Sequence, residues 1–313
     1  YESIVRKRVE KYFFDTPPTG QTVDKSTFIE GGIIVLLSKS WELYESDKRI
    51  EGFSPQTLKA YKLQSKLLIQ HFNDVNIESL MTNQLKEYLA KSSEHLKPSS
   101  LAHRIRFIKS LFRWSYEEGH IPKNPAAKIK EPKQGKRIPK FLTDREIEHL
   151  REACFTPMEK ALFELMFSTG CRIGEIVSLE KNSINWSNRS AIVLGKGDKE
   201  REVYFNIRCE IWLKRYLDLR QDKDPAIFVT LRNPHKMSIG QMRYIIKRIS
   251  SRAGINKEIH PHQLRHSYAT HLLNNGAPID VIQSLLGHEK SETTRIYAQL
   301  SGNLRREFYR KYF

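Results

Sequence analysis

The chain has 313 residues, which is long enough for two domains that each bury a hydrophobic core. Lysine and arginine number 53 against 36 aspartate and glutamate residues, so the formal net charge is +17. This charge favours nucleic acid as the large partner, ahead of an anionic membrane surface. The three cysteines are far apart, and no run reaches the roughly 18 apolar residues of a membrane helix. These features exclude a disulfide framework, a thiolate zinc site and a membrane span, and predict a soluble protein of a reducing, intracellular compartment.

Helical spacing dominates the first third of the chain. Ser54 is a good N-cap before Pro55, and a second periodic stretch starts at Ser99. Along that second stretch one face carries apolar residues three and four positions apart, namely Leu101, Ile105, Ile108, Phe112 and Tyr116. We therefore predict an all-helical domain over residues 33–122, and we leave residues 1–32 as an unassigned N-terminal extension.

A basic stripe lies beside this apolar face and consists of Arg106, Lys109 and Arg113. An ordinary solvated flank of a helix has the same pattern. The net charge of the chain favours a second interpretation, in which the three side chains contact DNA phosphates. Both interpretations stay open at this point.

Residues 123–142 have the composition of a basic interdomain linker. Three prolines interrupt regular structure between Lys123 and Lys140, and this stretch holds seven basic residues and one acidic residue. A basic, extended tether would follow a phosphate backbone, so the two domains would embrace DNA as a clamp, although a merely solvated linker has the same composition. The linker residues expected to contact DNA are Lys133, Lys136, Arg137 and Lys140.

A second domain is predicted over residues 143–298. Thr143 and Glu146 form a capping box at its start. Helical patterns follow, with one interruption in which two short strands, 191–194 and 203–205, flank a charged turn. The expected fold class is therefore mainly α with a small antiparallel β-sheet. Residues 299–313 form a helical-looking tail whose apolar residues need a partner.

The first segment with candidate chemistry is Ser-Thr-Gly-Cys-Arg-Ile-Gly-Glu, residues 168–175. Gly170 ends one helix and Arg172 begins the next, where free backbone N–H groups suit a phosphate. A plain salt bridge between Arg172 and Glu175 is the alternative for this pair taken alone.

Two more segments carry groups that move protons or bind anions. Lys196 lies in the charged turn and is suited to protonate a leaving alkoxide, with Lys199 as a competing candidate. His262 and Arg265, three residues apart, would converge on one phosphate at the start of a helix. A metal site built on His262 and His266 is the weaker interpretation, because there is no His-Glu-x-x-His motif and no thiolate or carboxylate lies close in the sequence to complete a zinc site.

The last segment ends a helix with Leu-Leu-Gly-His, and Tyr297 follows nine residues after His288. Most tyrosines are amphipathic packing residues, so the local sequence alone does not make Tyr297 a nucleophile.

Together these segments resemble the tyrosine recombinase family, the site-specific DNA recombinases that include phage integrases and Xer proteins. The resemblance is strong over residues 143–297 and depends on the ordered motifs Thr-Gly-x-Arg, Gly-Lys-Gly, His-x-Leu-Arg-His, Leu-Gly-His and the final tyrosine. It implies an integrase-type catalytic domain after a helical core-binding domain.

The resemblance also implies a role for each site residue. Arg172 and Arg265 would grip the scissile phosphate, with Glu175 orienting Arg172. Tyr297 would attack the phosphorus. The remaining roles are protonation of the 5′ oxygen by Lys196, movement of the tyrosine proton by His262 and a hydrogen bond to the phosphate from His288. No cofactor and no metal are implied, because the covalent 3′-phosphotyrosyl link conserves the energy of the broken strand.

The implied activity is strand exchange through a Holliday junction, and the implied partners are double-stranded DNA with paired sites and three further copies of the chain. An accessory directionality protein and a nucleoid-associated place in the bacterial cytoplasm follow from the same resemblance. A strand transferase like the type IB topoisomerases and a non-catalytic sequence-specific DNA-binding protein are the alternatives. The second of these leaves the ordered set of site residues unexplained.

Overall fold

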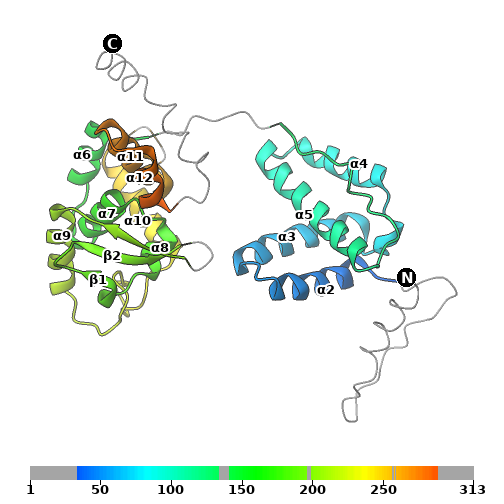
Figure 1. Cartoon of the computed structure of the whole chain (residues 1–313), viewed down its shortest axis with the longest axis horizontal. Coiled ribbons are helices and arrows are strands. Elements are labelled where there is room, and N and C mark those ends of the chain that lie inside the picture. The colour runs from blue at the N-terminus through cyan, green and yellow to red at the C-terminus, as the bar shows by residue number, and fades with distance from the viewer. Residues whose placement is uncertain (1–33, 134–140, 196–198, 256, 258, 288–313) are drawn as a thin grey trace, which may run out of the picture. The chain divides into compact units, whose positions relative to one another are not determined.

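The computed structural model describes residues 34–133, 141–195, 199–255, 257 and 259–287 (Figure 1). The chain forms two compact units, residues 1–135 and 136–313. Within the described residues no helix combines the length and the apolar character that crossing a bilayer requires.

The described part of the first unit is helical. Its elements are α2 (Leu37–Ile50), α3 (Pro55–Phe72), the short 3₁₀ helix η1 (Ile77–Ser79), α4 (Thr82–Ser93) and α5 (Pro98–Glu117). Helix α3 begins as predicted, because the Ser54 hydroxyl accepts a hydrogen bond from the Thr57 N–H at 3.2 Å. Helix α5 buries Ile105, Ile108 and Phe112 in the core, whereas Tyr116 at the end of the predicted apolar face is 51% exposed.

The start of the predicted linker packs against this first unit. Ala126 and Ile129 are buried in the same core as α5. The Asn124 side chain accepts a hydrogen bond from the Ala126 N–H at 2.9 Å, and the Pro125 carbonyl accepts one from the Thr82 hydroxyl at 2.8 Å. These few apolar and turn-forming residues therefore pack the start of the predicted linker, residues 123–142, onto the first unit.

The described part of the second unit combines helices with one small sheet. Its elements are α6 (Asp144–Glu152), α7 (Pro157–Thr169), α8 (Ile173–Ser178), η2 (Lys181–Ser183), β1 (Ile184–Asn185), β2 (Ser190–Leu194), β3 (Glu200–Tyr204), α9 (Ile207–Asp218), α10 (Ile239–Arg252), α11 (Pro261–Asn274) and α12 (Ile279–Leu286). Helix α7 is the central helix, since ten of its 13 residues are buried. The capping box predicted at Thr143 and Glu146 is present at the start of α6.

The sheet is antiparallel with strand order β1-β2-β3. Ser190 pairs with Tyr204 and Leu194 with Glu200, so β2 and β3 form the predicted hairpin. The two-residue strand β1 was not predicted. Ala191, Val193 and Val203 face the core, so the two paired strands are anchored on the unit by one face. The predicted fold class, mainly α with a small antiparallel sheet, is confirmed.

Candidate active site

The junction of α7 and α8 positions the first arginine. Gly170 ends α7 in the left-handed region at φ +60°, and a Cβ there would lie 2.3 Å from Cδ1 of Tyr268. Only glycine allows this tight turn, which places Arg172 at the N-cap of α8 as predicted.

Glu175 holds Arg172 through two bonds. Its Oε2 accepts from the Arg172 backbone N–H at 2.7 Å, and its Oε1 accepts from Arg172 Nη1 at 2.8 Å. The Glu175 side chain is 4% exposed. Burial raises the pKa of Glu175, but hydrogen bonds from Arg201 and Arg172 outweigh burial and lower the pKa overall. The carboxylate therefore stays charged at neutral pH.

The second arginine is buried on α11. Arg265 is 4% exposed, and its Nη1 donates to the Gly170 carbonyl at 2.7 Å while its Nη2 donates to the Leu286 carbonyl at 2.6 Å. Arg172 reaches the next carbonyl, that of Gly287, through Nη2 at 3.5 Å. The structure therefore brings both predicted arginines to the C-terminal end of α12.

His262 lies one turn before Arg265 on α11. Partial burial lowers its pKa, and the positive charges of Arg265 and Arg172 lower it further. The imidazole is therefore neutral at pH 7 and is able to accept a proton. His266, the other histidine of the discarded metal interpretation, also has a pKa lowered by burial and by His262 and Arg265. The described residues hold no cluster of three His, Cys, Asp or Glu side chains suited to a metal ion.

Lys196, His288 and Tyr297 lie outside the described residues. Two of their neighbours are described. Gly195 donates its N–H to the Lys199 carbonyl at 2.8 Å, and a Cβ on Gly195 would lie 3.9 Å from Glu175 Oε1. Gly287 ends α12 in the left-handed region and contacts Arg172 through its carbonyl. Both glycines therefore border the site formed by Arg172, Glu175 and Arg265.

Comparison with known proteins identifies the family. The model of the phage integrase family matches residues 140–303, and the model of its N-terminal SAM-like domain matches residues 44–119. The chain belongs to the phage integrase family. It is 36% identical to tyrosine recombinase XerD of Proteus mirabilis over 266 residues, which is 80% of this chain and 85% of that protein. These matches confirm the family predicted from the ordered motifs. Tyrosine recombinases are DNA strand transferases.

Solved structures have the same fold. A lambda integrase tetramer bound to a Holliday junction has a TM-score of 0.69 at 21% identity, and covers 82% of this chain and 78% of that chain. The XerH site-specific recombinase in a post-cleavage complex with its palindromic difH substrate has a TM-score of 0.70 at 20% identity, covering 87% and 84%. At this identity the similarity shows the fold.

The sequence analysis missed Arg201 at this integrase-family site. Arg201 lies on β3, and its Nη1 and Nη2 donate to Glu175 Oε1 and Oε2 at 2.8 and 2.7 Å. The signal was present in the strand, because Arg201 precedes the buried Val203 by two positions and therefore shares its inward face. A charged residue on the inward face of a strand requires a buried partner.

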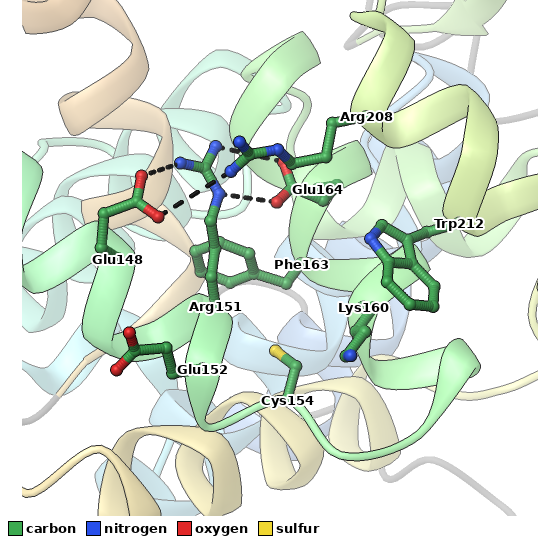
Figure 2. Close-up of a pocket in the computed structure, with 9 residues that line it drawn as sticks. All are labelled: Glu148, Arg151, Glu152, Cys154, Lys160, Phe163, Glu164, Arg208 and Trp212. Atoms are coloured by element: carbon green, nitrogen blue, oxygen red, sulfur yellow. Dashed lines mark hydrogen bonds and ion pairs between the residues drawn. The ribbon is translucent and has the colours of Figure 1, made fainter.

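A pocket of about 240 Å³ between α6, α7 and α9 does not belong to the site (Figure 2). Arg151, which lines this pocket, is already paired, since it binds Glu164 at 2.7 Å and also contacts Glu148. The thiol of the pocket, Cys154, donates to the Leu150 carbonyl at 3.2 Å, and burial raises the pKa of that thiol to about 12. The pocket therefore offers no reactive nucleophile at neutral pH.

Gly170→Ala tests the turn before Arg172. Gly254 also has a positive φ, +63°, but a Cβ there would meet nothing within 4 Å, so Gly254→Ala is the matched control. We expect the control to lose about 1 kcal/mol of unfolding free energy from backbone strain, and Gly170→Ala to lose at least about 1 kcal/mol more because Tyr268 must move. Denaturant unfolding of both variants measures the difference. Equal losses would show that the contact with Tyr268 does not determine the turn.

Proposed function

We propose that this chain cuts and rejoins duplex DNA at paired recombination sites through a covalent 3′-phosphotyrosyl intermediate at Tyr297. The observation that carries the proposal is the convergence of Arg172 and Arg265 on the end of α12, beside His262, whose pKa is lowered by burial and then by both arginines. Membership of the family and the resemblance to recombinase structures support it.

Arg172 and Arg265 bind the scissile phosphate in this mechanism. Their guanidinium groups neutralise the charge that builds on the non-bridging oxygens as the phosphorus becomes pentacoordinate. Arg265 is held rigidly by two carbonyls, and the 3.5 Å bond from Arg172 to Gly287 is long enough to be exchanged for a phosphate oxygen at low cost. Both groups are therefore oriented before DNA binds.

The proton transfers follow from the other site residues. The Tyr297 oxygen forms a bond to phosphorus as the bond from phosphorus to the 5′ oxygen breaks. His262 takes up the tyrosine proton, Lys196 gives a proton to the departing 5′ oxygen, and His288 donates a hydrogen bond to the phosphate. A new 5′ hydroxyl reverses these steps, so strand exchange consumes neither ATP nor a metal ion.

DNA binding uses both predicted domains, residues 33–122 and 143–298, with the basic segment that follows Ile129 between them. On α5, Arg106 is ion-paired with Glu131 at 3.0 Å and Arg113 lies 3.8 Å from Glu117. Exposed pairs of this kind are weak, so both side chains are available to phosphates. Lys109 is half-buried and Lys133 is exposed, whereas Lys136, Arg137 and Lys140 lie outside the described residues. Charge-removing variants of the proposed contacts would weaken DNA binding and flatten its salt dependence.

The proposed assembly is a homotetramer that exchanges strands through a Holliday junction, with an accessory directionality protein as a further partner. The tail, residues 299–313, docks on a neighbouring copy in this proposal, because Leu304, Phe308 and Phe313 are apolar residues in need of a partner. DNA as the substrate and bacterial relatives support a nucleoid-associated, cytoplasmic location.

Tyr297→Phe tests the nucleophile. With nicked DNA carrying the cognate site, in EDTA, the unaltered chain should form a covalent adduct that survives denaturant, and Tyr297→Phe should form none while binding the DNA equally well. Tyr244→Phe, which alters an exposed tyrosine of α10, is the control and should react normally. An adduct in Tyr297→Phe would assign the nucleophile elsewhere. If the unaltered chain binds the site specifically but forms no adduct, the proposed strand-cleavage activity is contradicted.

His262→Gln tests the proton acceptor. Because the pKa of His262 is lowered, its imidazole is neutral above pH 6.5, and the cleavage rate of the unaltered chain should fall only as the pH drops below that value. The variant should be about 100-fold slower and lose this acid limb. Single-turnover cleavage between about pH 5 and 8 measures both effects, with His271→Gln on the same helix as the control. An unchanged acid limb in His262→Gln would rule out this role.

Removal of residues 303–313 tests the tail. Binding to a single site should be unchanged, because the DNA contacts lie elsewhere, and pairing of two sites should weaken. Electrophoretic separation of single-site and paired-site complexes measures both. Full recombination by the shortened chain would contradict docking on a neighbour.

A further inference from the structure

Arg201 has no role in the mechanism proposed above. It lies on β3, its side chain is 12% exposed, and it donates three hydrogen bonds to described residues. Two go to the two oxygens of Glu175, and the third goes from Nε to the Leu285 carbonyl at 3.2 Å. Arg201 therefore joins the carboxylate that holds Arg172 to the end of α12.

The carboxylate of Glu175 is divided between two arginines. Arg201 occupies both oxygens with a bidentate fork, and Arg172 bonds to one of them through Nη1 and to the other through its backbone N–H. The fork takes about half of the roughly four acceptor positions of the Glu175 carboxylate. Arg172 consequently makes only one side-chain bond to the carboxylate and directs Nη2 toward Gly287.

The aliphatic part of Arg201 supports the end of α12. A Cβ on Gly287 would lie 2.9 Å from Arg201 Cδ, so the glycine turn packs directly on this side chain. The Leu285 carbonyl, which has no partner within the helix at this position, accepts the Nε–H. Both contacts fix the backbone at Gly287, the residue immediately before His288.

We propose that Arg201 is a positioning residue for strand cleavage: it holds Glu175 so that Arg172 turns toward the scissile phosphate, and it fixes the end of α12. The inference rests on the proposed function of Arg172. Without Arg201, both carboxylate oxygens of Glu175 are open to the guanidinium of Arg172, which then forms a bidentate pair and is withdrawn from the phosphate.

The test compares Arg201→Met and Arg201→Lys with the unaltered chain. Methionine keeps most of the side-chain length but has no donor, and lysine keeps the charge but not the fork. Arg208→Met is the matched control, since Arg208 lies in the same unit, is 52% exposed and is 3.8 Å from Glu148. Each variant is assayed for single-turnover cleavage at saturating nicked DNA, for its Kd for that DNA and for its melting temperature.

We expect Arg201→Met to cleave about 10- to 100-fold more slowly, the range in which partners that orient reactive groups contribute, with the Kd for DNA unchanged. Arg201→Lys should be intermediate, and Arg208→Met should cleave at the normal rate. Normal cleavage by Arg201→Met would overturn the proposal. Loss of the folded state in both Arg201 variants would also overturn it, because the residue would then be structural.

A substrate with a methylphosphonate at the scissile position distinguishes positioning from general damage. This group has no negative charge, so cleavage of it depends less on Arg172. The defect of Arg201→Met, or of Arg201→Lys if the methionine variant does not fold, should therefore shrink at least about threefold on the neutral substrate, since it acts through charge neutralisation. An equal defect on both substrates would overturn the proposal. Absence of cleavage of the ordinary phosphate substrate by the unaltered chain would instead contradict the proposed function.

Discussion

Three consecutive carbonyls at the end of α12 are each bound by a different arginine. Arg201 of β3 binds Leu285, Arg265 of α11 binds Leu286, and Arg172 at the start of α8 binds Gly287. The last carbonyls of a helix have no partners within the helix, and the helix dipole attracts cations to them. The three arginines therefore supply hydrogen bonds to the last carbonyls of α12. The same bonds bring together three side chains from elements that are far apart in the sequence.

This arrangement leaves an imbalance of charge that suits a phosphate. Glu175 is the carboxylate that binds two of the three arginines, and it is itself buried and charged. A single carboxylate does not neutralise three guanidinium groups, so an anion that enters the site is stabilised by the remaining positive charge. Burial lowers the pKa of His262, and the charges of Arg265 and Arg172 lower it further, so the neutral imidazole is able to accept a proton. Anion binding and proton transfer thus depend on one cluster.

The sequence predicted the parts of this site that depend on local rules. The end of α7 at Gly170, the capping box of Thr143 and the hairpin follow from glycine geometry, capping and alternation, and the ordered motifs identified the family. Long-range packing was not predictable from local patterns. Ile129 belongs to the first core although its neighbours are basic, β1 is too short to have a pattern, and the partner of Arg201 is 26 residues away in the sequence. The acceptors on α12 are backbone carbonyls, so no residue type in the sequence indicates them.

The most direct test of the account is a crystal structure of the chain with nicked cognate DNA and vanadate, which takes the place of the pentacoordinate phosphorus. The account predicts Nη atoms of Arg172 and Arg265 about 3 Å from the equatorial vanadate oxygens, with the Tyr297 oxygen at an apical position and Arg201 still bound to Glu175. A vanadate bound without Arg172 and Arg265, with both arginines remaining on the α12 carbonyls alone, would contradict the claim that this cluster is the phosphate site.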